Sequence, residues 1–375
     1  MKVLIVYHYI ALYREPIFKE LLNNSEIDFY FAASKYSNND IKLVGLESEI
    51  YESEHFFELN NQWVNNSFLW QSNLLKVLRE NHFDHVVFLG DPHFISTWIS
   101  LFYLKMKKVK TSLWTHGFIG RSHKFQDSLK LLMYKLSDVI FLYGEEAKAD
   151  LIYAGLPSSK LSVIYNSLDY LKQKETRESL SYNDSFSMKQ KLFANFNDLQ
   201  LFFIGRLTKH KKLDMLIDAI NVLAVKDVRV NVLFIGDGES SDELKEKVKQ
   251  YSLEKQFYFY GATHDEFEIA KLIFSSDVCV APGEVGLTAM HSLAYGVPVI
   301  THDNRFKQMP EYESIIHNET GLLFEYDSID SLANNIEKVV NLIGSDCRDK
   351  CINIIESKYN PSTQVKLFTK TLKLL

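Results

Sequence analysis

Cysteine is scarce in this sequence, and no long apolar run is present. The three cysteines are Cys279, Cys347 and Cys351. Cys279 lies in an apolar segment that predicts a core strand. Cys347 and Cys351 are one helical turn apart, and a metal site there would need further ligands nearby. We therefore expect reduced, structural thiols and a reducing compartment. Because no run of about 18 apolar residues occurs, we expect no membrane-spanning helix.

A secretory signal and an excess of positive charge are also lacking. The first residues, MKVLIVYHYIALYREP, are typical of a strand and a turn, with charge arriving at Arg14. The net charge is -6 at pH 7, which argues against a general nucleic-acid binder. These absences favour a cytoplasmic protein that does not bind nucleic acid.

The composition that is present is typical of a soluble globular protein, with 46% hydrophobic and 24% charged residues. The 26 phenylalanines and 20 tyrosines suit large cores and a site that stacks on aromatic rings. A chain of 375 residues is too long for one ordinary core, so we expect two domains.

Short apolar segments alternate with amphipathic ones in both halves of the chain, which predicts an α/β fold with doubly wound parallel sheets. The expected strands are Val3–Tyr7, Phe29–Ala32, His85–Leu89, Thr111–Thr115, Val139–Tyr143, Leu161–Ile164, Leu201–Ile204, Val228–Ile235, Phe257–Tyr260, Val278–Ala281 and Val299–Ile300. The expected helices include Pro16–Leu22, Leu69–Asn81, Phe94–Lys105, Asp127–Leu136, Glu145–Ala154, Lys212–Leu223, Asp242–Tyr251 and Ser362–Leu375.

A polar stretch at Lys172–Asp198, with a helical patch near its end, separates the two halves. We predict two Rossmann-like domains, at residues 1–169 and at residues 170–359. The last helix, at residues 360–375, is expected to pack back on the first domain. Doubly wound sheets bind ligands at the carboxyl ends of their strands, so two such sheets are expected to face a central cleft.

The most informative segment is DVCVAPGEVGLTAMHSLAYGVPVITHDN, from Asp277 to Asn304. An apolar strand leads into a loop with Gly283 and Gly286, and a helix is expected from about Leu287. The first N–H groups of a helix lack partners and its dipole favours negative charge, so this loop predicts a phosphate site. A plain β–α turn explains the same residues when they are taken alone.

A second constellation, Gly205-Arg206 with Lys211, follows another predicted strand. Arginine offers a fork of donors and lysine a mobile point charge, which together suit a diphosphate. Lys209 and Lys212 beside them are interpreted as a solvated basic turn. Taken alone, Gly205-Arg206 with Lys211 is also compatible with a solvated basic turn that binds no ligand.

Together the motifs resemble the GT-B retaining glycosyltransferases of family 4, the glycogen-synthase-like group (glycosyl transferases group 1). The resemblance covers nearly the whole chain and is strongest from Leu201 to Phe324. The family motif G-R-x4-K is matched by Gly205-Arg206 with Lys211, the motif G-x-G by Gly236-Asp237-Gly238, and the motif F-x-G by Phe259-Tyr260-Gly261. The motif N-x-x-G-L-L is matched by Asn318 to Leu323. In the first half of the chain, the motif N-G-V-D is matched by Asn166-Ser167-Leu168-Asp169.

The resemblance implies that residues 1–169 form the acceptor domain and residues 170–359 the nucleotide-sugar donor domain. It also implies roles for several residues of the second domain. Arg206 and Lys211 would neutralise the donor diphosphate in place of a metal ion, and the lack of a D-x-D motif agrees with a reaction that needs no metal or other cofactor. The nucleobase would stack near Gly261 and Ala262. Backbone amides would hold the distal phosphate, and they belong to Val285, Gly286, Leu287 and Thr288.

Two positions depart from the family's pair of glutamates. In register with Gly296-Val297-Pro298, the first glutamate, which meets the donor sugar, falls on Gly283. The second, which meets the nucleoside ribose, falls on His291. Glu284 is free to swing into the first place because Gly283 frees the backbone, and a neutral His291 still donates and accepts hydrogen bonds. The alternatives are a solvent-facing Glu284 and an ordinary helix histidine.

In the first half, His116 follows a predicted strand, and many family members carry a histidine there near the transferred sugar. The resemblance therefore implies that His116 contacts the donor. Arg121, His123 and Lys124 are candidates for gripping an acceptor phosphate. The aromatic loop Tyr7–Arg14 is a candidate floor for an acceptor sugar. Each of these residues is also compatible with ordinary packing in a turn.

The segment Phe94–Lys110, FISTWISLFYLKMKKVK, is an aromatic, apolar helix with a lysine-rich end. Such a helix can lie on an anionic membrane surface. The alternative is a helix that covers the sheet and has a basic end.

We therefore predict a metal-independent retaining glycosyltransferase (hexosyl- or N-acetylhexosaminyltransferase) of cell-surface polysaccharide synthesis, of the O-antigen or capsule type. Its donor would be a nucleotide-diphosphate sugar, with UDP favoured on family grounds. Its acceptor would be a saccharide or a polyprenyl-diphosphate-linked oligosaccharide at the inner face of the membrane. The missing glutamates leave a catalytically silent GT-B subunit as an alternative, and a nucleotide-sugar epimerase is a third.

Overall fold

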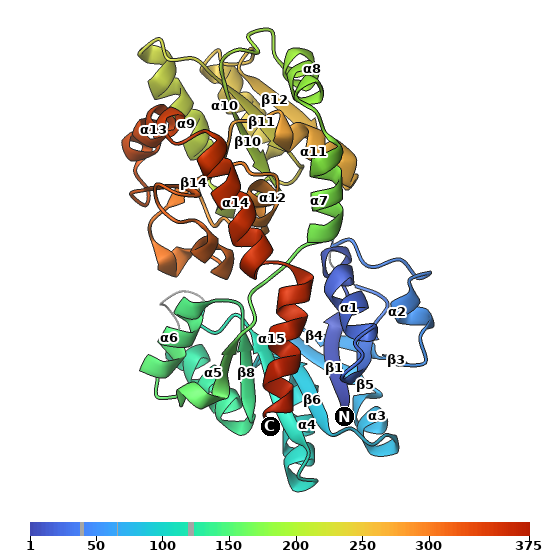
Figure 1. The fold of residues 1–375 in the computed structure, drawn as a ribbon. Helices are drawn as coiled ribbons and strands as arrows, with labels where there is room; N and C mark the ends of the chain where they lie inside the picture. Colours follow the sequence, from blue (N-terminus) through green and yellow to red (C-terminus); the bar gives the residue numbers. More distant parts are fainter. Residues whose placement is uncertain (38–40, 66, 119–123) are drawn as a thin grey trace. The chain divides into compact units, whose positions relative to one another are not determined.

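The computed structural model describes residues 1–37, 41–65, 67–118 and 124–375. This described part of the chain forms two compact units (Figure 1). Unit 1 comprises Met1–Leu168 together with Asn360–Leu375, and unit 2 comprises Asp169–Tyr359. Each unit is built on a sheet of parallel strands, which confirms the predicted fold class of two doubly wound, Rossmann-like domains.

The sheet of unit 1 has seven strands among the described residues, in the order β3-β2-β1-β6-β7-β8-β9. Both faces of the sheet are covered, which is why its strands are nearly continuous apolar runs. The strands are β1 (Lys2–Tyr9), β2 (Asp28–Ser34), β3 (Phe56–Glu58), β6 (His85–Leu89), β7 (Lys110–Thr115), β8 (Val139–Leu142) and β9 (Leu161–Val163). A separate antiparallel hairpin joins β4 (Asn60–Val64) to β5 (Phe68–Ser72).

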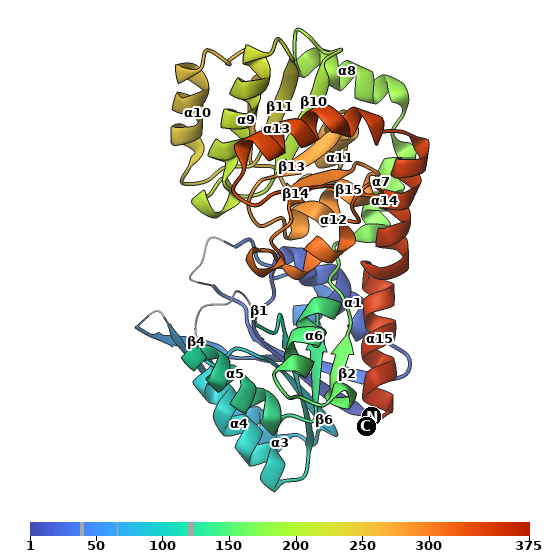
Figure 2. The same ribbon diagram turned by 90° about the vertical axis from the view of Figure 1, so that its left-hand side faces the viewer.

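Helices pack on both faces of this sheet (Figure 2). One core lies under α1 (Glu15–Leu22), α2 (Glu49–Glu52) and α15 (Pro361–Lys373). The other lies under α3 (Leu74–Glu80), α4 (Ile95–Met106), α5 (Lys124–Leu136) and α6 (Glu145–Tyr153). None of the helices in the described part of the chain has the length and apolarity needed to cross a membrane.

The last helix, α15, contributes directly to the core of unit 1. Phe368 is fully buried, and its ring stacks on the ring of Phe141 with a centroid distance of 4.2 Å. The side-chain oxygen of Gln364 accepts a hydrogen bond from Ser167 Oγ at 2.7 Å. The chain therefore leaves unit 1 after Leu168 and returns to it at Asn360.

The sheet of unit 2 has six strands among the described residues, in the order β12-β11-β10-β13-β14-β15. The strands are β10 (Leu199–Ile204), β11 (Val230–Ile235), β12 (Phe257–Gly261), β13 (Val278–Ala281), β14 (Val299–His302) and β15 (Gly321–Phe324). The order reverses between β10 and β13, because the chain first extends the sheet through β11 and β12 and then returns to the other side of β10. Doubly wound sheets bind ligands at the carboxyl end of such a switch point.

Two groups of helices cover the sheet of unit 2. The first group is α9 (Leu213–Val225), α10 (Ser241–Gln250) and α13 (Ile329–Lys338). The second group is α7 (Tyr170–Ser179), α8 (Tyr182–Leu192), α11 (Glu266–Phe274), α12 (Leu287–Ala294) and α14 (Ser345–Lys358).

Two expected elements differ in the structure. The helix expected at Leu69–Asn81 is wrong in its first part, because residues 68–72 form β5 and α3 starts only at Leu74. Burial in β5 alternates with period two, which is the pattern of a half-buried strand. The polar stretch before β10 contains two helices, and α8 begins with a capping box formed by Ser181 and Asp184.

Candidate functional site

The loops that follow β10 and β13 touch one another at the switch point of unit 2. The N–H of Gly283 donates to the carbonyl of Lys211 at 3.0 Å. A Cβ atom on Gly283 would lie 2.1 Å from the carbonyl oxygen of His210. Only glycine permits this approach, so Gly283 brings the predicted phosphate loop against the loop that carries Arg206 and Lys211.

Thr288 fixes the first turn of α12 to the end of β10. Its Oγ1 donates to the carbonyl of Ile204 at 2.7 Å, and its side chain is buried. Gly286 precedes the helix with a φ of +49°, a conformation that favours glycine. The amino end of α12 is therefore held beside Gly205, where β10 ends.

The amino end of α12 has open backbone amides. Within the described residues, no acceptor is found for the N–H groups of Gly286, Leu287 and Thr288. The N–H of Val285 differs, because it donates to Oε1 of Gln308 at 2.9 Å. Open amides and the helix dipole together make this end of α12 suitable for an anion.

The basic residues beside this helix end are in different states. Lys211 Nζ lies 2.9 Å from the backbone oxygen of Glu284 and 3.4 Å from its Oε1. Arg206 is exposed, and its guanidinium has no hydrogen-bond or ion-pair partner in the described part of the chain. Lys212 Nζ is 2.6 Å from Asp327 Oδ1, so Lys212 is engaged elsewhere in the unit.

His291 lies within α12 rather than at its open end. Its Nδ1 is 3.3 Å from Nε2 of Gln173, which belongs to α7. Burial lowers the pKa of His291, and the nearby Glu266 opposes that effect only partly. The imidazole is therefore neutral at pH 7, a form that can both donate and accept a hydrogen bond.

The residues predicted for the nucleobase lie at the end of β12. The carbonyl of Gly261 accepts a hydrogen bond from the N–H of Gly236 at 2.8 Å, and Ala262 is exposed. Since β12 belongs to the same parallel sheet as β10, this end lies on the same edge as Gly205. Unit 2 thus has Gly205, Gly261 and the loop before α12 along one edge of its sheet, whereas His291 lies farther along α12.

His116 belongs to unit 1, where it follows β7. Its ring lies 4.5 Å from the ring of Tyr143. Burial, together with the charges of Arg14 and Lys130, lowers the pKa of His116 to about 4. A neutral His116 at pH 7 can both donate and accept a hydrogen bond.

Sequence reasoning missed Arg14, which shapes the surroundings of His116. Arg14 is 4% exposed. Its guanidinium donates to Tyr143 at 2.7 Å and to Asn166 at 2.6 Å. Long polar side chains are seldom buried. The three-residue 3-10 helix Leu12–Arg14 is too short to carry a periodic signal, so only the folded chain reveals this contact.

The predicted acceptor residues are only partly described. Arg121 and His123 lie outside the described residues, and Lys124 is described only as the first residue of α5. The aromatic loop predicted at Tyr7–Arg14 is wrong in its first part, because β1 extends to Tyr9, which is buried. Tyr13 lies beyond the strand and is 42% exposed. Only Tyr13 of these two rings thus presents a large surface to a ligand.

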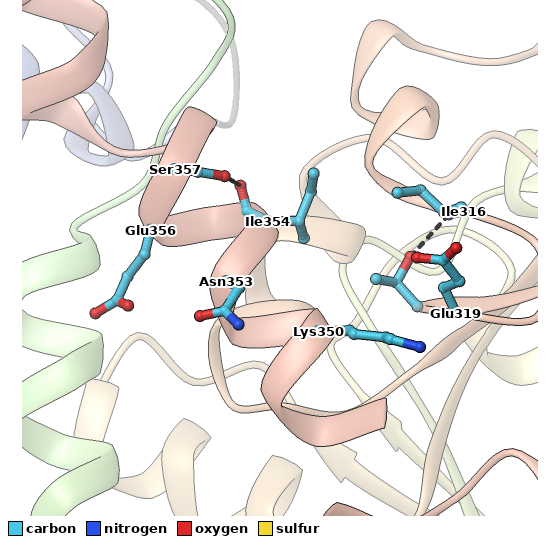
Figure 3. Close-up of a pocket in the computed structure, with 8 residues that line it drawn as sticks. Ile316, Glu319, Lys350, Asn353, Ile354, Glu356 and Ser357 are labelled. Carbon is cyan, nitrogen blue, oxygen red and sulfur yellow. Dashed lines mark hydrogen bonds between the residues drawn. The ribbon is translucent and has the colours of Figure 1, made fainter. Parts of the chain in front are cut away.

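An open pocket of about 510 Å³ lies elsewhere in unit 2, between the segment before β15 and helix α14 (Figure 3). Its lining includes Ile316, Glu319, Lys350 and Asn353, and none of the predicted donor-site residues. In the described part of the chain, no group of three His, Cys, Asp or Glu side chains is placed to hold a metal ion.

Comparison with known proteins gives a consistent result. Residues 184–357 match the family model of glycosyl transferases group 1. An uncharacterized 41.2 kDa protein from the cps region of Klebsiella pneumoniae is 24% identical over 314 residues, covering 80% of this chain and 81% of that protein. A GDP-mannose-dependent phosphatidylinositol dimannoside mannosyltransferase of Mycobacterium tuberculosis is 32% identical over 111 residues, but these cover only 29% of this chain and 28% of that enzyme.

Solved structures show the same fold over the whole chain. The Anabaena HepE protein in complex with UDP is 17% identical and has a TM-score of 0.76, with 100% of both chains covered. The sucrose-phosphate synthase of Thermosynechococcus elongatus is 14% identical with a TM-score of 0.71, covering 100% of this chain and 99% of that one. At these identities the likeness shows the fold alone, which is the GT-B fold with its two Rossmann-like domains.

Proposed function

Because residues 184–357 belong to the glycosyl transferases group 1 and the chain has the GT-B fold, we propose that this protein transfers a sugar from a nucleotide-diphosphate donor to a saccharide or lipid-linked acceptor with retention. The observation that carries the proposal is the meeting of two loops at the switch point of unit 2, where the loop that carries Arg206 and Lys211 lies against the loop that leads into the open amides of α12. Cations and a helix amino end in such loops are what a diphosphate requires.

Catalysis is mainly electrostatic in this proposal. As the bond to the sugar breaks, negative charge builds on the leaving diphosphate, and Arg206, Lys211 and the α12 amides stabilise it. Lys211 first has to exchange its contacts with Glu284 for the phosphate. These cations act in place of a metal ion. The acceptor hydroxyl attacks from the same face as the departing phosphate, and an oxygen of that phosphate takes up the hydroxyl proton.

The remaining site residues contact the sugar and the nucleoside. We assign Glu284 and His116 to the donor sugar, His291 to the ribose, and Gly261-Ala262 to the base. UDP is favoured because the Anabaena structure contains UDP. The relative from a cps region supports cell-surface polysaccharide synthesis as the setting, with unit 1 binding the acceptor and unit 2 the donor.

A donor screen tests this function directly. UDP-, GDP- and ADP-sugars are incubated with the full chain and saccharide acceptors, in EDTA and without it, and released nucleotide is measured. Arg206→Gln should lower kcat/KM about 10- to 150-fold, because a hydrogen bond to a charged group contributes about 1.5–3 kcal/mol. The matched control is Lys209→Gln, an exposed cation of the same loop. Unchanged turnover in Arg206→Gln contradicts the assignment.

A silent GT-B subunit is the second candidate, because Gly283 and His291 replace the two family glutamates. The same screen separates the candidates. Absence of both nucleotide-sugar binding and nucleotide release across all donors indicates the silent subunit. Release that occurs without an acceptor, with an altered sugar as product, indicates an epimerase.

We also propose that α4 rests on an anionic membrane surface, where a lipid-linked acceptor is found. Four apolar residues, spaced four, three and four positions apart, form one exposed stripe on α4: Ile95, Ile99, Phe102 and Met106, which are 39%, 42%, 53% and 77% exposed. Lys105, Lys107 and Lys108 are exposed beside the carboxyl end of the stripe. An apolar helix face bordered by lysines is typical of helices that lie in the membrane interface.

Vesicle sedimentation tests this membrane contact. The full chain should bind vesicles of phosphatidylcholine with phosphatidylglycerol more tightly than pure phosphatidylcholine vesicles. Replacing each of the three lysines by Gln should weaken binding about fivefold, because each basic residue near an anionic surface contributes about 1 kcal/mol. Phe102→Ser should also weaken it, whereas Val225→Ser, at an 83% exposed site on α9, should not. Equal binding to both vesicle types contradicts the proposal.

A further inference from the structure

Gln308 follows β14 in the sequence. Its side-chain amide forms hydrogen bonds with three residues in or beside the loop between β13 and α12. Its Oε1 accepts from the N–H of Val285 at 2.9 Å. Its Nε2 donates to Oγ1 of Thr301 at 2.8 Å and to the carbonyl of His302 at 3.2 Å. One carboxamide thus connects the loop before α12 to the carboxyl end of β14.

The orientation of this carboxamide is determined by its partners. The hydroxyl of Thr301 donates to the carbonyl of Ala281 at 2.8 Å, so it has no second proton to offer and can only accept from Gln308. The N–H of Val285 can only donate. Exchanging the oxygen and nitrogen of Gln308 would therefore lose all three hydrogen bonds.

These contacts close a ring around the short loop between β13 and α12. The ring runs from Ala281 through Thr301 and Gln308 to Val285. On its other side the loop is held by Gly283, which contacts the backbone of Lys211. The next residues of the chain, Gly286 to Thr288, carry the open amides, so their position depends on how this loop is held.

We infer that Gln308 is a positioning residue of the donor site, which holds the loop so that the α12 amides and Lys211 face the same diphosphate. The inference rests on the proposed function for its effect on the donor. In the opposite role, Gln308 competes with the donor for the N–H of Val285. The two roles predict changes of opposite sign when Gln308 is removed.

Two variants of the full chain test the inference with UDP as the probe. Gln308→Met keeps the size of the side chain and removes its hydrogen bonds. It should weaken UDP binding about 5- to 15-fold and raise the donor KM by a similar factor, with kcat changed less than threefold. Gln250→Met, an exposed residue at the end of α10, is the matched control and should bind UDP like the parent. Tighter or unchanged binding in Gln308→Met overturns the inference.

Gln308→Glu adds a readout that a simple loss of stability would not move. The carboxylate accepts from Val285 but offers nothing to Thr301, whereas the protonated carboxyl restores that donor. UDP binding by this variant should therefore improve relative to the parent as the pH falls. The neighbouring ionisable groups Lys211, Glu284 and His302 are the same in both proteins, so the difference reports on position 308.

Hydrogen exchange separates this inference from the proposed function. In the absence of any nucleotide, Gln308→Met should speed amide exchange at least tenfold in the peptide covering residues 282–290, and Gln250→Met should not. Unchanged exchange overturns the positioning role whatever the protein binds. If exchange is faster but the protein binds no UDP, GDP or ADP, the positioning of the loop by Gln308 is supported and only the function proposed for the site is contradicted.

Discussion

Lys211 and Glu284 form an ion pair at the open end of α12, with Nζ 3.4 Å from Oε1 and 2.9 Å from the backbone oxygen of the same residue. The side chain of Lys211 is 17% exposed and that of Glu284 is 39% exposed. The carboxylate therefore stands where the lysine would otherwise meet an incoming anion. A donor that binds to Lys211 has to displace this contact or share it.

Glu284→Gln should separate the two roles of this residue. Removing the negative charge should tighten the binding of free UDP about two- to fivefold, because partly exposed ion pairs contribute up to about 1 kcal/mol. Transfer from a UDP-sugar should nevertheless fall, since the carboxylate is proposed to hold a hydroxyl of the donor sugar. Titration calorimetry and steady-state kinetics measure the two effects. If transfer rises together with UDP affinity, Glu284 is only an inhibitory partner of Lys211.

Gly283→Ala should disrupt the approach of the two loops. The new Cβ atom would lie 2.1 Å from the carbonyl oxygen of His210 and 2.8 Å from the Cα of Lys211, so the backbone has to move. We expect kcat/KM to fall more than 100-fold and the free energy of unfolding of unit 2 to fall by about 1–3 kcal/mol. Enzyme kinetics and urea unfolding measure these changes.

Gly344→Ala is the matched control for that substitution. Gly344 has an extended φ of 167°, and no atom lies within 4 Å of the position of its Cβ. The same chemical change should therefore leave activity and stability within about 0.5 kcal/mol of the parent. A loss of similar size in both variants would show that the close contact at Gly283 is not the cause.

His85 should make unit 1 less stable as the pH falls. It is 1% exposed, its Nε2 is 2.7 Å from Ser112 Oγ, and burial lowers its pKa from 6.5 to about 4. Below about pH 6.5, His85 takes up a proton in the unfolded chain but stays neutral in the folded chain. The free energy of unfolding therefore falls between pH 6.5 and pH 4. A difference of this size corresponds to about 3 kcal/mol when the loss is complete.

Urea unfolding at a series of pH values measures this effect. His85→Gln keeps a hydrogen-bonding side chain beside Ser112 but does not titrate, so its stability should depend less steeply on pH. Other histidines of unit 1 whose pKa values are lowered by burial, His8 and His116, keep part of the slope in both proteins. The exposed His82 supplies the control, and His82→Gln should retain the full slope of the parent. A parallel slope in His85→Gln contradicts the expectation.

The strands were predictable because a parallel sheet buried on both faces leaves nearly continuous apolar runs. VNVLFI of β11, for example, is buried at all of its positions. Helix α7 was not predictable in this way. Its buried residues are Tyr170, Gln173 and Arg177, and Arg177 is accommodated because it donates to the carbonyl of Ala294. A helix whose buried face is polar gives no apolar period, and its partners lie far away in the sequence.

The candidate site also contains some residues that the sequence predicts and others that it does not. Glycines and cations next to predicted strand ends could be placed from the sequence, because parallel strands end on one edge of the sheet. Gln308 could not, since it acts on Val285, a residue 23 positions earlier, through a side chain with no motif around it. Contacts of this kind arise only after both segments have folded.

The place of α15 in unit 1 has a consequence for how the protein is made. Phe368 fills a core that also contains Phe29, Trp114 and Phe141, all from the first 168 residues of the chain. Those residues emerge from the ribosome long before position 368 is synthesised. Unit 2 can complete its own core during translation, while the core of unit 1 stays open until its last helix emerges. The first part of the chain to be synthesised is thus the last to finish folding, and it is the part most exposed to chaperones and proteases in the interval.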